Sequence, residues 1–90
     1  MKQLTLYSRT GFCLCEGLES RLRDLDLKGL SIELIVIDID ASGTPQELKS
    51  RYDLEVPVLA LDGSELPRVS PRLRGEGLLD WLQRCLSTAL

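Results

Sequence analysis

The chain has 90 residues, 43% of them hydrophobic and 28% charged, with a formal net charge of −3 and no histidine. This balance predicts a single globular domain over residues 1–90, and it offers no basic run for a nucleic-acid partner. The first residues lack the apolar segment of a signal peptide, and no apolar run approaches the ~20 residues of a membrane-spanning helix. We therefore expect a cytoplasmic protein that is monomeric and has no membrane partner.

Residues 3–8 predict a first strand, and a helix follows from residue 12 or 13 to residue 27. Apolar side chains recur in this helix at intervals of four, four and three residues, at Leu14, Leu18, Leu22 and Leu25. They are expected to form the face that packs on the sheet. Gly29 is the expected end of the helix, because glycine commonly follows a helix C-terminus.

Residues 31–40 form the clearest strand of the sequence, with a run of β-branched side chains that favours burial on both faces. Three signals then predict the start of a second helix. Thr44 is a good N-cap, Pro45 suits the first helical position, and Glu47 completes a capping box. This helix is short and ends near Asp53.

Residues 55–61 predict a third strand that Pro57 opens. Asp62-Gly63 predicts a tight hairpin to a fourth strand, residues 65–69, which Pro67 places at a sheet edge. Ser70-Pro71 is expected to cap a final helix, firm from about Glu76. The apolar face of this helix comprises Leu78, Leu79, Leu82, Cys85 and Leu86.

The predicted elements follow the order β-α-β-α-β-β-α. The first strand–helix–strand unit requires a parallel pair with a right-handed crossover, and the Asp-Gly turn requires an antiparallel pair. We therefore predict an α/β fold, a four-stranded mixed sheet flanked by helices on both faces.

The most informative residues are two cysteines at the start of the first helix. Unpaired backbone N–H groups and the helix dipole favour a thiolate at this position, so Cys13 is the candidate nucleophile and Arg9 would add positive charge nearby. Since Leu14 starts the apolar face, we expect Cys15 to turn partly away from the core. Two interpretations stay open for each cysteine. Cys13 is a redox thiol or a small, partly exposed side chain without selected chemistry, and Cys15 is a redox thiol or a small apolar side chain buried under the turn.

The spacing Cys-x-Cys raises the question of a disulfide between Cys13 and Cys15. Residues two apart on a helix do not face each other, so the bridge would distort the first turn and would be readily reduced. Cys85 is predicted to be a core residue. With three cysteines and no histidine, we expect no structural disulfide framework and no metal site within one chain.

Two segments carry a resemblance to a known family, Leu6-Tyr7-Ser8-Arg9-Thr10-Gly11 before the cysteines and Val56-Pro57-Val58 at the third strand. Together with the element order, they resemble the glutaredoxin-like family of the thioredoxin fold. The similarity is to the bacterial group with a Cys-His-Leu-Cys site, here altered to Phe-Cys-Leu-Cys. In that alignment Phe12 stands in place of the first cysteine and Cys15 matches the second.

The resemblance implies a thiol–disulfide oxidoreductase or a redox-sensing protein that uses Cys13 and Cys15. Its partner would be a protein or small-molecule disulfide or thiol. The residues implied for the substrate site are Arg9, Thr10, Phe12, Val56 and Pro57, with Pro57 in the cis form. The Gly-Gly-Asp/Ser stretch that holds glutathione in typical glutaredoxins is replaced by residues 69–72, Val-Ser-Pro-Arg. We therefore expect no tightly bound cofactor, and this replacement argues against glutathione.

Two alternatives to an enzyme stay open. Loss of the first motif cysteine to Phe12 favours a binding module that has lost catalysis and recognises an extended peptide or partner beside Pro57. A dimer could also hold a metal or cluster through Cys13 or Cys15. Asp38 and Asp40, at the end of the second strand, are predicted to be solvated charges rather than an acid–base pair.

Overall fold

The computed structural model describes residues 2–88 and has the predicted order of strands and helices. A short 3₁₀ turn, η1, precedes the second strand. The elements are β1 (Lys2–Ser8), α1 (Cys13–Arg23), η1 (Lys28–Leu30), β2 (Ile32–Asp38), α2 (Gln46–Tyr52), β3 (Val58–Leu61), β4 (Ser64–Glu65) and α3 (Gly75–Thr88). None of the helices in this described part is long and apolar enough to cross a membrane.

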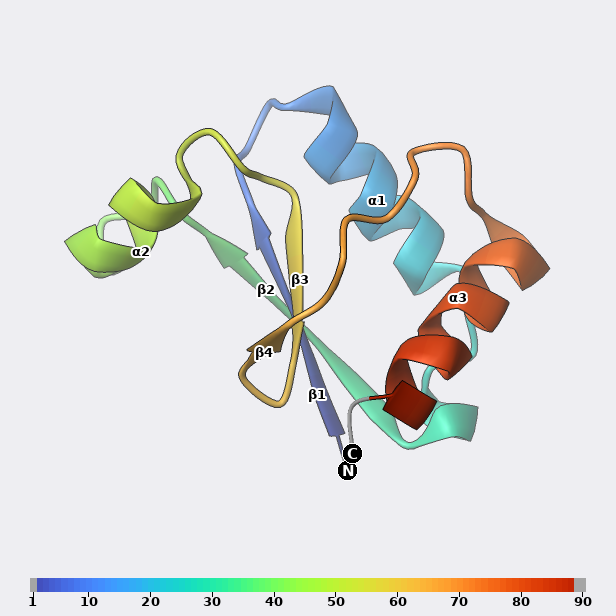
Figure 1. Cartoon of the computed structure of the whole chain (residues 1–90). Coiled ribbons are helices and arrows are strands. Elements are labelled where there is room, and N and C mark those ends of the chain that lie inside the picture. The colour runs from blue at the N-terminus through green and yellow to red at the C-terminus, as the bar shows by residue number, and fades with distance from the viewer. Residues whose placement is uncertain (1, 89–90) are drawn as a thin grey trace.

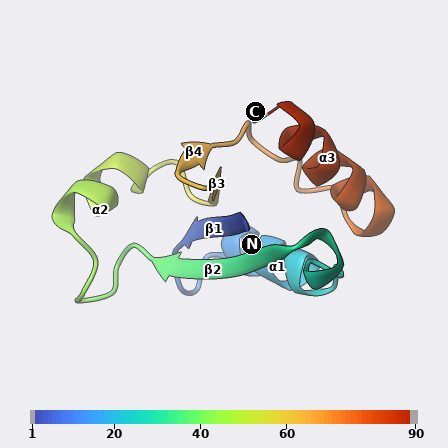
Figure 2. The same ribbon diagram turned by 90° about the horizontal axis from the view of Figure 1, so that it is seen from below.

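The sheet has the order β2-β1-β3-β4 (Figure 1). β1 runs parallel to β2, with Leu4 opposite Leu34, and antiparallel to β3, with Leu4 opposite Leu61. β3 and β4 are antiparallel. The predicted mixed α/β sheet is therefore confirmed. Figure 2 shows α1 and α3 on one face of the sheet and α2 on the other.

The main core lies between the sheet and the pair α1 and α3. Alternate residues of β1 point to this face, so Leu4 and Leu6 are fully buried against Leu18 of α1 and Leu78 of α3. Burying one leucine side chain contributes about 1.5–3 kcal/mol to folding. The predicted core face of α3 is confirmed for Leu78, Leu82 and Cys85, whereas Leu79 and Leu86 are half-buried.

The hairpin after β3 forms as predicted. Asp62 and Gly63 both adopt positive φ angles, 49° and 89°, the geometry of a type I′ turn that follows the twist of the strands. The Asp62 carboxylate also accepts the N–H of Gln3 at 2.8 Å, which ties the turn to β1. The fourth strand was predicted too long: β4 has two residues, and Pro67 lacks the N–H needed to extend it.

The second strand is not buried on both faces as predicted. β2 is an edge strand, and after Ile32 its residues are exposed or half-buried. The reason is topological. The chain returns from α2 to the opposite side of β1, so β1 becomes the central strand and β2 has one neighbour.

The predicted helix ends were also wrong at three places. α1 ends at Arg23 instead of residue 27, and Asp26 accepts the Gly29 N–H instead of continuing the helix. Thr44 does not cap α2, because its hydroxyl donates to the Asp38 carbonyl oxygen at 2.6 Å and Pro45 is the N-cap. α3 begins at Gly75, beyond the predicted Ser70 cap, whose hydroxyl oxygen accepts a bond within its own turn.

Candidate functional site

The loop after β1 brings the two cysteines to the start of α1. Phe12 is the N-cap residue, and its N–H donates to the Arg9 carbonyl oxygen at 3.2 Å. Gly11 has a φ of 83°, a conformation that favours glycine, and its N–H donates to the Glu16 carboxylate at 3.0 Å. This turn makes Cys13 the first residue of the helix and Cys15 the third.

The two thiols have opposite surroundings. Cys13 is exposed, whereas Cys15 is 1% exposed and packs in a second cluster with Ile39, Tyr52 and Val56. Two residues along an α-helix correspond to a rotation of about 200°, so the side chains leave the helix on nearly opposite sides. The expectation that Leu14 faces the core and Cys15 turns away is therefore wrong, because Leu14 is 49% exposed.

Burial raises the pKa of the Cys15 thiol above its ordinary value. The backbone of Arg9, through a hydrogen bond, and the positive charge of Arg9 act in the opposite direction. Tyr52 covers the same cluster and stacks on Tyr7, with ring centroids 4.5 Å apart. Burial thus favours the protonated form of the Cys15 thiol and shields it from solvent.

The Val56–Pro57 peptide bond is cis. Val56, one of the residues implied for the substrate site, is buried, and its N–H donates to the Tyr52 carbonyl oxygen at 3.2 Å. This N–H is therefore not free to pair with an extended peptide. Pro57 itself borders a small cavity of about 70 Å³. Three residues of α1 also line this cavity: Leu14, Leu18 and Arg21. Leu14 directly follows Cys13 in the sequence.

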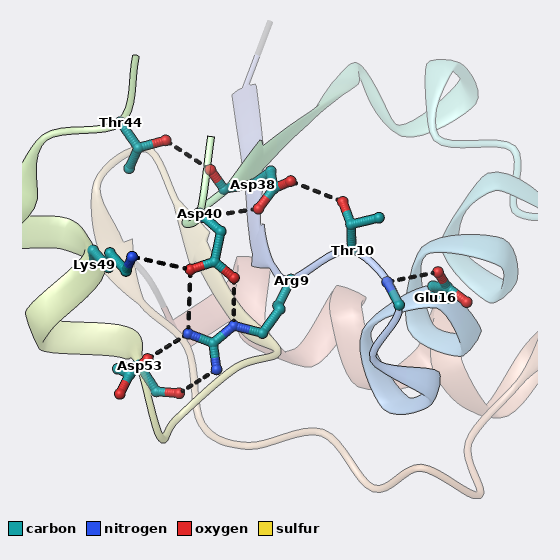
Figure 3. Close-up of polar contacts among 9 residues, drawn as sticks. Arg9, Thr10, Glu16, Asp38, Asp40, Thr44, Lys49 and Asp53 are labelled. Carbon is teal, nitrogen blue, oxygen red and sulfur yellow. Dashed lines mark hydrogen bonds and ion pairs between the residues drawn. The ribbon is translucent and has the colours of Figure 1, made fainter. Parts of the chain in front are cut away.

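Arg9 does not extend toward Cys13 as a free charge. Its guanidinium donates to the Asp40 carboxylate at 2.6 Å and to both the carboxylate and the carbonyl oxygen of Asp53 (Figure 3). Lys49 approaches the same Asp40 carboxylate at 3.5 Å. The hydrogen bonds of the two carboxylates raise the pKa of Arg9, and those of Arg9 hold the pKa of Asp40 below its ordinary value. Arg9 therefore ties three loops together.

Thr10 is likewise engaged within the chain. Its hydroxyl donates to the Asp38 carboxylate at 2.8 Å, and the same carboxylate accepts the Asp40 N–H at 2.8 Å (Figure 3). Asp40 is exposed at the end of β2, as expected of a strand-end charge, and Asp38 is half-buried. Their bonds to Arg9 and Thr10 were not predicted. A signal was present in the sequence, because β1 and β2 were predicted to be parallel, and their C-terminal ends bring Arg9 and the aspartates to one edge.

Comparison with known proteins gives this site its family. Residues 3–83 match the family described as glutaredoxin-like domain (DUF836). The chain belongs to this glutaredoxin-like family. No curated protein matches it.

Solved structures agree with the family. This glutaredoxin-like chain is 26% identical to a structural genomics target protein from X. campestris, with a TM-score of 0.54 over 90% of this chain and 96% of that one. A mutant thioredoxin from Halobacterium salinarum is 27% identical, with a TM-score of 0.58 over 90% and 70% of the two chains. Oxidised mitochondrial thioredoxin 3 from Saccharomyces cerevisiae, at 16% identity, has a TM-score of 0.59 over 92% and 77%. The fold is thioredoxin-like, and the family indicates a thiol-redox-related role.

The glutaredoxin-like site also has an apolar rim that the sequence suggested only in part. Phe12 is 40% exposed at the N-cap, as its assignment to a contact surface requires, and Leu54 in the loop before β3 is 89% exposed. The loop of Phe12 and the loop of Leu54 are linked by a hydrogen bond from the guanidinium of Arg9 to the carboxylate of Asp53.

The described residues, 2–88, contain no group of three His, Cys, Asp or Glu side chains that could hold a metal ion.

Proposed function

We propose that this glutaredoxin-like protein carries out thiol–disulfide exchange with Cys13 as the attacking thiol. The observation that carries the proposal is the exposure of Cys13 at the first position of an eleven-residue helix. The next residue, Leu14, lines the small cavity that Pro57 borders. The first turn of a helix has unpaired N–H groups and the positive end of the dipole, which stabilise a thiolate. Family membership supports the same chemistry.

In the first step, the Cys13 thiolate attacks one sulfur of a disulfide substrate. A new disulfide forms between Cys13 and that half of the substrate, and the other half leaves as a thiolate. In the second step, an external thiol attacks the substrate sulfur and releases Cys13 as a thiolate. The substrate disulfide has then been exchanged, with no net change in the oxidation state of the protein.

Cys15 takes a conditional part in this scheme. If the first turn of α1 opens, the Cys15 thiolate can attack the Cys13 sulfur, which releases the substrate thiol and leaves a Cys13–Cys15 disulfide for an external reductant. The burial of Cys15 and its orientation away from Cys13 make this route slow. Exchange through Cys13 alone is therefore the faster route.

The test uses a neutral probe, bis(2-hydroxyethyl) disulfide, with intact-protein mass spectrometry as the readout. We expect a rapid mixed disulfide on the wild type, on Cys15→Ser and on the matched control Cys85→Ser, and at least a ~100-fold slower reaction of Cys13→Ser. A wild type that reacts no faster than a free cysteine peptide would exclude the exchange function. Equal rates for wild type and Cys13→Ser would exclude the assignment of Cys13.

The exposed apolar rim supports a second candidate, a thioredoxin-fold binding module that contacts a partner beside Pro57. Phe12, Leu14 and Leu54 are the large hydrophobic side chains that the described chain leaves exposed. Titration of isotope-labelled protein with an extended apolar peptide separates the candidates. A binding module shifts the amide signals of Leu14 and Val58 in wild type and Cys13→Ser alike, and these shifts disappear in Phe12→Ser. An exchange protein without this function shows no shift.

A further inference from the structure

The two edges of the sheet differ in how they are protected. At one edge, β4 has only two residues, and Pro67 follows it. At the other edge, β2 has seven residues, Ile32–Asp38, without proline, lysine or glycine. Proteins usually protect an exposed edge by short length, proline or lysine, because its unpaired N–H and C=O groups recruit another strand. β2 therefore has the properties of a pairing edge.

The hydrogen bonds of β2 identify the unpaired groups. The Ile39 N–H donates to the Ser8 carbonyl oxygen at 2.9 Å, so odd-numbered residues of β2 direct their backbone groups toward β1. Even-numbered residues direct theirs outward, since successive residues of a strand alternate. Among residues 2–88, the outward groups of Leu34 and Val36 have no hydrogen-bond partner.

The chain itself occupies outward groups at both ends of this edge. The Ile32 N–H donates to the Leu27 carbonyl oxygen at 2.9 Å, and the Asp38 carbonyl oxygen accepts the Ala41 N–H at 3.1 Å. The middle of β2 is consequently the segment that can accept a strand. Its central residue is Ile35, which is half-buried. Leu34 and Val36 belong to the core on the α1 and α3 side, so the Ile35 side chain points to the opposite face, on which α2 lies (Figure 2).

We propose that β2 pairs antiparallel with β2 of a second copy of this chain, with Ile35 on the two-fold axis. In this register Leu34 lies opposite Val36 of the second copy, and both residues direct their N–H and C=O groups at each other. Ile35 lies opposite its own copy in a non-hydrogen-bonded pair, the type in which side chains approach most closely. The edge is thus complementary to itself, as an isologous dimer requires.

The position of α1 fits the same dimer. α1 lies over β1 and β2, so joining two β2 strands brings the two copies of α1 about two strand spacings apart, roughly 10 Å. Packed helices in proteins have interaxial distances of about 8–10 Å. The continuous sheet and the helix pair can therefore form together without a change of fold.

The charges along this edge favour the antiparallel arrangement. Glu16 and Glu19 of α1 line a cavity of about 300 Å³ together with Val36 and Asp38 near the end of β2, and Arg23 lines one of about 630 Å³ together with Ile32 and Glu33 at its beginning. Side chains of both charges on α1 therefore border this edge, and the two-fold axis reverses their order in the second copy. Glu19 and Arg23 already form an ion pair at 2.9 Å, which would meet its reversed copy in a four-charge ring.

Two charge-reversal variants, measured singly and mixed, test this interface by sedimentation equilibrium. We expect a concentration-dependent dimer for the wild type that weakens with added salt. Glu19→Arg and Arg23→Glu each place four like charges at the axis and should raise the dimer Kd at least ~10-fold. An equimolar mixture of the two variants should dimerise again, because one copy is then basic and the other acidic. Glu76→Arg, on the exposed start of α3, is the control and should leave the Kd unchanged.

Amide hydrogen exchange locates the contact independently of the charges. Slower exchange of the Leu34 and Val36 amides at high protein concentration supports pairing through β2, and unchanged exchange in a dimer overturns it. A wild type that stays monomeric up to millimolar concentration also overturns the proposal, as does a dimer that neither variant weakens. None of these measurements depends on the thiol chemistry of Cys13.

Discussion

Cys13 and Cys15 occupy one turn of the same helix, yet one is exposed and the other is 1% exposed. Their separation of two residues gives a helical rotation of about 200°, and the sheet lies on the Cys15 side. Cys15 consequently belongs to a packed cluster with Ile39, Tyr52 and Val56, whereas Cys13 has the electrostatic benefit of the helix start without that cover. The rotational position of each residue around the helix (the helix phase), rather than its closeness in sequence, therefore determines which thiol is buried and which is exposed.

The largest expected effect is the contrast in their alkylation rates. Iodoacetamide should modify Cys13 at least ~100-fold faster than Cys15 at pH 8, because Cys15 reacts only after local opening, and two factors of ten correspond to about 2.8 kcal/mol. The time course is followed by peptide mass spectrometry. In concentrated denaturant the two rates should converge. Comparable rates in the native protein would contradict the buried position of Cys15.

A change of helix phase should convert the separated thiols into a pair. Residues three apart on a helix are neighbours, so Phe12→Cys combined with Cys13→Ser places two thiols on one face, at positions 12 and 15. We expect an intramolecular disulfide under mild oxidation. We also expect the variant to release a substrate thiol from its mixed disulfide ~10-fold faster than the wild type does. Loss of two hydrogens in the intact mass and stopped-flow kinetics measure the two effects.

The matched control for this conversion is Leu14→Cys combined with Cys13→Ser. It also provides an exposed cysteine near Cys15, but adjacent residues of a helix do not face each other. The control should form intermolecular dimers instead of the internal bridge. If both variants form the bridge equally well, helix phase does not govern the pairing.

A smaller effect is expected from loosening the cover over Cys15. Ile39 is fully buried in the same cluster, and Ile39→Val should cost about 0.5–1.5 kcal/mol of unfolding free energy in urea titration. If local opening of this cluster is what exposes the thiol, alkylation of Cys15 should be about 2–10-fold faster in Ile39→Val than in the wild type. Ile35→Val, on half-buried β2, is the control. It should leave Cys15 alkylation unchanged, and equal acceleration by both variants would indicate global unfolding instead.

The sequence predicts local features of this fold well. The order of strands and helices along the chain and the Asp62-Gly63 hairpin depend on neighbouring residues and were confirmed. Burial of Cys15 was one of two open interpretations, and the spacing could not choose between them. Positions 14, 18 and 22 and positions 15, 18 and 22 each fit one face of a helix. Only the position of the sheet selects the second spacing, and it leaves Leu14 exposed.

Long-range topology explains the other differences. An apolar run such as residues 32–37 predicts a central strand until the return path of the chain is known, and here that path makes β2 an edge. Thr44 was expected to cap α2, but the carbonyl oxygen of Asp38 competes for its hydroxyl. Arg9 was implied for the substrate site, and the pairing of its guanidinium with two aspartates distant in sequence was not predicted.

The smallest expected effect concerns the ion pair between Arg9 and Asp40. Because the Arg9 hydrogen bond lowers the pKa of Asp40, the ionised carboxylate is favoured in the folded state. Its stabilisation is complete above the ordinary aspartate pKa of about 4 and is lost as the pH falls through the lower folded value. Asp40→Asn should therefore lower the Tm modestly at pH 7, and the difference from wild type should shrink toward pH 2–3. Asp80→Asn, on the exposed side of α3, is the control for the loss of one carboxylate. A difference between wild type and Asp40→Asn that stays constant from pH 7 to pH 2 would mean that ionisation of Asp40 contributes nothing to the stability of the fold.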